Sequence, residues 1–163
     1  MESSEVRRVL IVANRTAATP TLLDEVRRRV TQCPHSFALL IPDAGSRSES
    51  DWTMDRAVPM LERAARGKVA GLVGGSQAFE SVKAAVEEGA YDEIIVSTLP
   101  RRTSRWLRND LPRRIARLGV PVSVVTPGER RKGVTVDEWA SMNQHWQWTD
   151  RDRPGWVDDP DRT

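Results

Sequence analysis

The sequence predicts a three-layer α/β domain with a parallel, doubly wound sheet, and two observations lead to that prediction. Five short, almost continuous apolar runs recur along the chain, as expected for strands buried on both faces. Between successive runs, apolar residues recur at every third or fourth position, as on one side of an amphipathic helix. Strands that alternate with helices join by right-handed crossovers into a parallel sheet, here with the first strand central.

The elements follow from these two patterns. The predicted strands are VLIVA (9–13), FALLI (37–41), VAGLV (69–73), EIIVS (93–97) and VPVSVV (120–125). Four helices lie between them, and their apolar stripes consist of Leu22, Val26 and Val30; Met54, Val58, Leu61 and Ala65; Phe79, Val82 and Val86; and Leu111, Ile115 and Leu118.

Residues typical of helix ends flank these stripes. Pro59 falls inside the second helical pattern and predicts either a kink or a later helix start. The predicted caps or first-turn residues are Thr19, Ser76 and Asp110, and glycines 67, 89 and 119 are the predicted stops.

Length and composition limit the class of protein. A chain of 163 residues, 39% hydrophobic and 29% charged, fits one folded domain with an appendage. No apolar run is long enough to span a membrane, and the first residues lack a signal-peptide layout, so we expect a cytoplasmic protein. Cys33 has no partner for an intramolecular disulfide, and two histidines are too few and too scattered to indicate a metal site.

Charge is unevenly distributed although the net charge is only +2. Residues 101–132 carry ten basic side chains against two acidic ones, whereas residues 137–163 carry seven acidic against three basic. Adjacent segments therefore carry opposite charge, and this distribution bears on how the C-terminal segment docks and on which partners the chain binds.

The succession of VLIVANRT at the first strand and EIIVSTLPRRTSRWLRNDLPRRIARLGVPVSVVTP at the end of the domain resembles the universal stress protein family. The resemblance covers roughly residues 6–126. It implies a five-stranded parallel sheet in the order 3-2-1-4-5, a homodimer, a role in stress response or regulation, and, in one branch of the family, adenine-nucleotide binding by a loop of pattern G-x2-G-x9-G-[ST]. The domain is then residues 1–126, followed by a Trp-rich, acidic extension at 127–163.

The glycines of that nucleotide loop are absent from this chain. Ser97 and Pro100 take the places of the first two glycines, and Asn109 with Asp110 best matches the final pair. Asn14 replaces the acidic residue that the family has after strand one. Such loops bind phosphate through backbone N–H groups, and Pro100 has none to donate. Binding of ATP in the family's usual mode is therefore not expected.

Side chains at the same place offer a different way to bind phosphate. In open α/β sheets ligands bind beyond the carboxyl ends of the strands, where strand order reverses, here between strands one and four. Arginine forks grip phosphate, and Trp106 is suited to stacking on a base. An alternative interpretation is a solvated loop with Trp106 and Leu107 tucked under it. The candidate ligand-binding residues are Asn14, Arg15, Thr16, Ser97, Thr98, Arg101, Arg102, Arg105 and Arg108.

Two further segments carry sequence patterns that bear on ligand or partner binding. GGSQAFE (74–80) places two glycines before a helix N-terminus, which suits either a phosphate or simply a tight turn, and the turn is favoured. Residues 136–148 have helical apolar spacing in the extension, which contributes Trp139, Trp146, Trp148 and Trp156. We expect this part of the extension to pack on its own domain, in preference to binding a partner.

The function predicted from these observations is binding rather than catalysis, because no catalytic motif is present and no catalytic residue or metal ligand can be assigned. The leading ligand is a phosphate-bearing small molecule, with ATP or AMP as candidates, at the crevice between strands one and four. One alternative is a dimeric scaffold that recruits partners through its C-terminal extension with no ligand. Another is weak nucleic-acid binding through the basic loop, which the near-neutral total charge disfavours.

Overall fold

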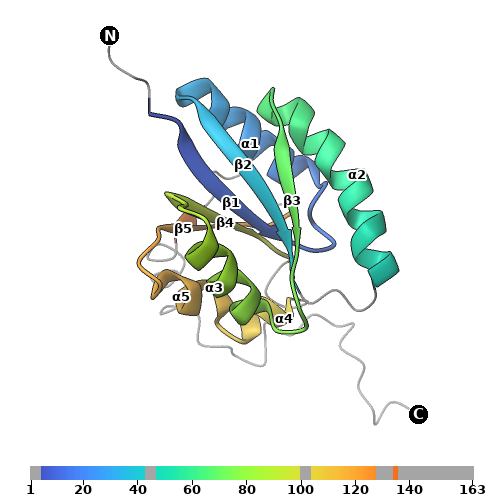
Figure 1. Ribbon diagram of the computed structural model, residues 1–163, viewed down its shortest axis with the longest axis vertical. Coiled ribbons are helices and arrows are strands. Elements are labelled where there is room, and N and C mark those ends of the chain that lie inside the picture. The colour runs from blue at the N-terminus through green and yellow to red at the C-terminus, as the bar shows by residue number, and fades with distance from the viewer. Residues whose placement is uncertain (1–4, 43–46, 100–103, 128–133, 136–163) are drawn as a thin grey trace, which may run out of the picture.

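The computed structural model describes residues 5–42, 47–99, 104–127 and 134–135, with the backbone alone at 47–52, 105, 108, 134 and 135. Five strands within these ranges form the parallel part of the sheet: β1 (Arg7–Ala13), β2 (His35–Ile41), β3 (Val69–Val73), β4 (Glu93–Ser97) and β5 (Val122–Val125). They lie in the order β3-β2-β1-β4-β5 and all pair in parallel (Figure 1). The predicted α/β class, strand order and central first strand are confirmed.

A sixth strand, β6 (Val134–Thr135), was not predicted. It pairs antiparallel with β5, with Val124 opposite Val134 and Ser123 opposite Thr135. A strand of two residues is too short to produce a periodic pattern in the sequence. The pairing places the described part of the C-terminal extension along the outer edge of β5. Residues 136–163, including the four tryptophans and the predicted helix, lie outside the described residues.

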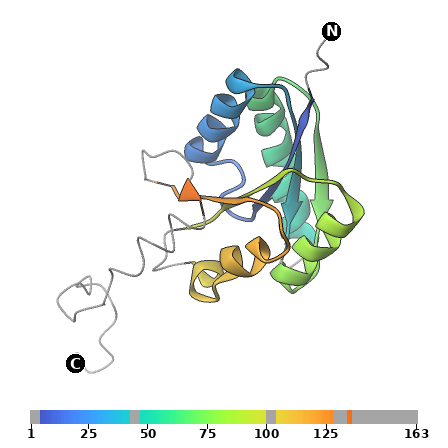
Figure 2. The ribbon, with the colours of Figure 1, turned by 90° about the vertical axis from the view of Figure 1, so that its left-hand side faces the viewer.

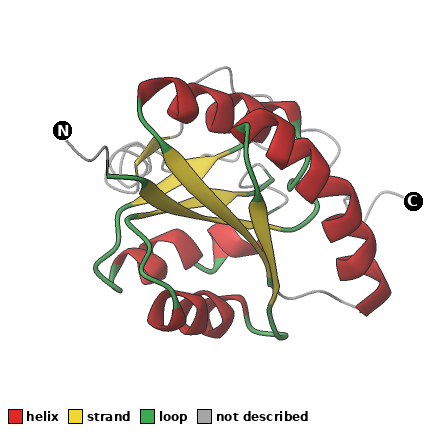
Figure 3. Cartoon of the chain, turned by 45° about the horizontal axis from the view of Figure 1, so that its top comes forward, coloured by secondary structure: helices red, strands yellow, loops and turns green. Residues whose placement is uncertain are grey.

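Helices cover both faces of the sheet, as Figures 2 and 3 show. They are α1 (Pro20–Gln32), α2 (Arg47–Ala65), α3 (Ala78–Glu88), α4 (Arg105–Arg108) and α5 (Leu111–Ala116). The side chains of α1 and α2 pack on one face of the sheet, and those of α3 and α5 pack on the other. The short helix α4 was not predicted.

Helix ends agree with the sequence in part. Thr19 and Asp110 stand at N-cap positions, although neither side chain makes a capping hydrogen bond, and Gly89 is the C-cap of α3. The prediction for Ser76 was wrong by one residue, because Gln77 is the N-cap of α3. Pro59 does not delay the second helix, since α2 begins at Arg47 and contains the proline.

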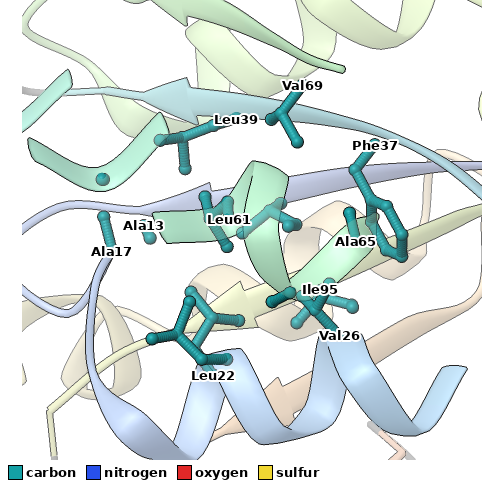
Figure 4. Packing of buried hydrophobic residues seen from close by; sticks show 14 of the residues in the cluster. Ala13, Ala17, Leu22, Val26, Phe37, Leu39, Leu61, Ala65, Val69 and Ile95 are labelled. Atoms are coloured by element: carbon teal, nitrogen blue, oxygen red, sulfur yellow. The ribbon is translucent and has the colours of Figure 1, made fainter. Parts of the chain in front are cut away.

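The core forms two layers because successive residues of a buried strand point to opposite faces. From β1, Val9, Ile11 and Ala13 join the layer under α1 and α2, where they meet Leu22, Val26 and Leu61 (Figure 4). Leu10 and Val12 join the other layer, with Val82 of α3 and Ile115 of α5. Each fully buried aliphatic side chain stabilises the fold by about 1.5–3 kcal/mol. The central strand is thus fixed from both sides, and the loops at its carboxyl end start from a rigid base.

Candidate functional site

The candidate site lies at the carboxyl ends of β1 and β4, which are neighbours in the sheet. Ala13, the last residue of β1, is in register with Ser97, the last residue of β4. From β1 the chain passes through α1 to β2 on one side, whereas β4 lies on the other side. This is the position where an open α/β sheet leaves room for a ligand. The loop after β1 and the segment after β4 therefore start side by side.

Hydrogen bonds between two buried residues tie these segments together. The hydroxyl of Thr16 donates to the carbonyl oxygen of Ser97 at 2.7 Å, and the Ser97 hydroxyl donates to Thr16 Oγ1 at 3.0 Å. Thr16 is 3% exposed and Ser97 is 0% exposed. Both are among the candidate ligand-binding residues. In the structure their hydroxyls are hydrogen-bonded to each other and form the frame of the site.

A second pair of hydroxyls continues this frame. Thr98 Oγ1 lies 2.5 Å from Ser104 Oγ, and both residues are buried. Ser104 Oγ also accepts a hydrogen bond from the backbone N–H of Leu107 at 3.2 Å, in the manner of an N-cap for α4. The backbone N–H of Thr98 donates to the carbonyl oxygen of Val125 at 3.0 Å. Thr98, a predicted ligand residue, is therefore also part of the frame.

Of the remaining candidate ligand-binding residues, some are described with their side chains, some by backbone only, and some lie outside the described ranges. Arg15 is exposed, and Asn14 is half-buried, with its side-chain amide donating to the carbonyl oxygen of Pro42 at 3.4 Å. Arg105 and Arg108 belong to α4, and only their backbone is described. The predictions for Arg101 and Arg102 lie outside the described residues. The structure thus brings Asn14, Arg15, Thr16, Ser97 and Thr98 together at one edge of the sheet.

Apolar side chains anchor the segment that follows. Leu107 is 4% exposed, and Trp106 is half-buried against the core layer that contains Leu111 and Ile115. This anchoring agrees with the interpretation in which Trp106 and Leu107 are tucked under the segment. Part of the Trp106 ring is committed to packing, which limits the surface that it offers for stacking on a base.

Asp110 lies just after α4, and its carboxylate is an acidic group close to the candidate phosphate site. Its backbone is left-handed, with φ of 56°, a conformation that glycine adopts at low cost. Its carboxylate lies 3.5 Å from the Arg113 guanidinium, one turn into α5. The negative charge of Asp110 is thus balanced by a neighbouring arginine.

The glycine pair at 74–75 forms a tight turn, as the sequence favoured. The N–H of Gly74 donates to the carbonyl oxygen of Ile41, and the N–H of Gly75 donates to Ser81 Oγ at 3.0 Å. A Cβ atom on Gly74 would lie 2.5 Å from Ser81 Oγ and 3.2 Å from the Cα of Pro42. Both amides are occupied within the protein, and close packing explains the first glycine.

A buried ionic group away from the site was not foreseen. We call Glu25, Arg28, Arg29, Glu93 and Ser123 the Glu25 cluster. Arg29 Nε donates to Glu25 at 2.9 Å, and its terminal nitrogens donate to Glu93 and to Ser123 Oγ. Arg28 donates twice to Glu25, at 2.5 and 3.1 Å. Glu25 and Arg29 are one turn apart in α1, and this spacing was a possible signal for a pair.

The Glu25 cluster shifts two ionisation equilibria. Burial raises the pKa of Glu25, but the hydrogen bond from Arg28 and the charges of Arg29 and Arg28 outweigh it, so the pKa lies below its ordinary value. The hydrogen bond to Glu25 raises the pKa of Arg28. The cluster joins α1 to the start of β4 and to β5, so its role is to fix the helix on the sheet.

Metal-ligating and thiol side chains form no further candidate site in the described ranges. No group of three or more His, Cys, Asp or Glu side chains there is arranged to hold a metal ion. Cys33 Sγ lies 3.7 Å from His35 Nδ1, but that nitrogen is 2.7 Å from the Cys33 carbonyl oxygen and bonds there instead. None of the helices within those ranges is long and apolar enough to cross a membrane. Searches against protein-family models and against curated proteins find no match for this chain.

Proposed function

We propose that this protein is a non-enzymatic, universal-stress-protein-like binding protein for a phosphate-bearing small molecule. An adenine nucleotide such as ATP or AMP is the leading candidate. The site lies at the carboxyl ends of β1 and β4 and uses arginine side chains. In this proposal the protein acts in a stress response or a regulatory process by sensing its ligand.

One observation carries the proposal. The Arg-rich segment leaves the sheet at Ser97, whose hydroxyl and carbonyl groups are bonded to Thr16 at the end of the neighbouring strand. Arg15, the residue before Thr16, is exposed at the same edge. The loop that carries Arg15 and the Arg-rich segment after Ser97 thus start on either side of the position where α/β sheets bind ligands.

The frame supports a side-chain mode of binding. Guanidinium groups form paired, charge-assisted hydrogen bonds with phosphate oxygens and need no close approach of the backbone. Rigid buried hydroxyl pairs at Thr16–Ser97 and Thr98–Ser104 keep the ends of the loops fixed. Such a frame reduces the conformational entropy lost on binding. The absence of the family's glycines is compatible with this mode.

The test is calorimetric titration of the full chain with ATP, ADP and AMP at low and high salt. The variant with Arg101→Ala and Arg105→Ala removes two proposed phosphate contacts. A matched control with Arg63→Ala and Arg117→Ala removes the same charge near the opposite edge of the sheet, where both residues are exposed. Charge-assisted hydrogen bonds contribute about 1.5–3 kcal/mol each, so the first variant is expected to bind far more weakly than the control.

Salt supplies an independent criterion. Binding through exposed arginines weakens as ionic strength rises, because mobile ions screen the charges. Absence of heat with all three nucleotides at millimolar concentration would reject nucleotide binding. Equal weakening in both double variants would instead indicate a general charge effect and not a site.

A scaffold without ligand is a second candidate, and β6 favours it. The start of the C-terminal extension is attached to β5 through Val134 and Thr135. The rest of the extension therefore follows a fixed strand, and in this second proposal its tryptophans contact a partner or a second subunit. Because β6 occupies the outer edge of β5, a homodimer formed by pairing of β5 strands requires displacement of β6. Sedimentation of the full chain distinguishes a dimer from a monomer.

A further inference from the structure

We propose that Ser104 is a positioning residue for the phosphate site, and this inference rests on the proposed function. Ser104 is 4% exposed and is not itself a ligand contact. Its hydroxyl fixes the place where α4 begins relative to the end of β4. The backbone of Arg105 and Arg108, which carries two of the proposed phosphate-binding side chains, starts from that place.

Three hydrogen bonds connect α4 to the sheet through Ser104 and Thr98. Ser104 Oγ lies 2.5 Å from Thr98 Oγ1, one residue beyond the end of β4. The same oxygen accepts the N–H of Leu107 at 3.2 Å, inside the first turn of α4. Thr98 is itself held to β5, since its N–H donates to the carbonyl oxygen of Val125. One oxygen atom therefore joins the helix to the sheet.

The arrangement also explains why a hydroxyl is needed at position 104. A helix of four residues is too short to be stable by itself, because forming the first turn is costly. Its position depends on the cap at Ser104 and on the burial of Leu107. Without the cap hydroxyl, burial of Leu107 still holds the segment near the core, but the hydrogen bonds that set the start of α4 are lost. The predicted consequence is weaker binding with limited unfolding.

The test measures the dissociation constant for ATP by equilibrium dialysis, and the melting temperature of each full-length variant by circular dichroism. Ser104→Ala removes the hydroxyl, and Ser104→Thr restores it. Ser81→Ala is the matched control, because Ser81 Oγ braces the loop after β3 by accepting a hydrogen bond from the Gly75 N–H at 3.0 Å and donating one to the Gln77 carbonyl oxygen at 2.9 Å.

Ser104→Ala is expected to raise the dissociation constant about tenfold, as loss of a helix cap and a buried hydrogen bond implies. Ser104→Thr is expected to keep the wild-type affinity, and Ser81→Ala to lower the melting temperature without changing affinity. Unchanged affinity in Ser104→Ala, or an equal loss in Ser81→Ala, would overturn the positioning role. If Ser104→Ala does not fold, Thr98→Val breaks the contact between the two hydroxyls at similar volume and leaves the cap on the Leu107 N–H in place. Thr98→Val is then expected to weaken binding, whereas unchanged affinity overturns the role.

Binding by the wild-type chain separates failure of the phosphate site from failure of the positioning role of Ser104. If wild-type protein binds ATP and Ser104→Ala binds it equally well, only the positioning role of Ser104 is rejected. Wild-type protein that binds no ATP, at any salt concentration, overturns the nucleotide site and the positioning role together.

Discussion

Replacement of Arg29 by Met tests the account of how α1 is fixed on the sheet. Arg29 is 7% exposed and donates hydrogen bonds to Glu25, Glu93 and Ser123. Methionine fills much of the same space but has no charge and no donor. The substitution leaves the Glu93 carboxylate, 12% exposed, without the arginine that neutralises it.

The expected loss is large. Removing one partner of a buried ion pair costs about 3–5 kcal/mol, because the remaining charge stays buried and uncompensated. Domains are stable by only about 5–15 kcal/mol, so the loss is a substantial fraction of the total. For a chain of this size, each kcal/mol lowers the melting temperature by about 2–4 °C. Glu25 keeps Arg28 as a partner, so the cost falls mainly on Glu93.

Urea unfolding followed by circular dichroism measures the change in the free energy of unfolding. Arg27→Met is the control, because Arg27 lies in the same helix and pairs with Asp24 at 2.8 Å on the exposed side. Exposed pairs contribute about 0–1 kcal/mol, so the control is expected to change stability little. Adding Glu93→Gln to Arg29→Met is expected to recover part of the loss, since it removes the uncompensated charge.

Two results would refute this reasoning. One is a loss for Arg29→Met as small as that for Arg27→Met. The other is a further loss when Glu93→Gln is added. Either would mean that the buried carboxylate is not the origin of the cost, and that α1 is held on the sheet by its apolar side chains alone.

Three further predictions concern stability. The folded-state pKa of Glu25 lies below the ordinary value of 4.5, so the contribution of Glu25 to stability is present above that pH and is lost as pH falls through the folded pKa. Below pH 4.5, the urea midpoint of unfolding is expected to fall more steeply in wild type than in Glu25→Gln. Gly74→Ala is expected to destabilise by about 1–3 kcal/mol in urea unfolding, because its Cβ meets Ser81 and the Pro42 backbone. Truncation after Gly128 removes β6 and is expected to lower the melting temperature.

Each of these predictions has an outcome that contradicts it. Identical pH profiles for wild type and Glu25→Gln would show that this carboxylate does not contribute to acid sensitivity. Wild-type stability in Gly74→Ala would mean that the loop moves to admit a methyl group at little cost. A truncated chain with unchanged melting temperature and unchanged sedimentation would show that the extension neither stabilises the domain nor supports a dimer.

Much of the fold was readable from sequence because strands buried on both faces form continuous apolar runs. The runs at 69–73 and 93–97 match β3 and β4. Where the first residues of a strand are polar, the apolar run starts later than the strand itself. β1 begins at Arg7 and β2 at His35, each two residues before the predicted run. Backbone pairing with the neighbouring strands continues through these polar residues, and a hydropathy pattern does not record backbone pairing.

Strand order was predictable at the candidate site, whereas the bonding of its polar groups was not. Strand order brings Thr16 next to Ser97, as the sequence suggested. A sequence identifies hydroxyls at a sheet edge but not which of them bond to each other, so the buried state of Thr98 and the cap at Ser104 were missed. The bond between Arg29 and Glu93 joins residues 64 positions apart and leaves no local signature.

The central claim is that this protein holds a phosphate-bearing molecule between β1 and β4. Mass spectrometry of the compounds released when purified full-length protein is denatured tests it most directly. We expect release of an adenine nucleotide or another phosphate-bearing compound in an amount comparable to that of the protein, and a marked reduction after Arg101→Ala with Arg105→Ala. Protein that releases no such compound, or a double variant that releases as much as wild type, would contradict it.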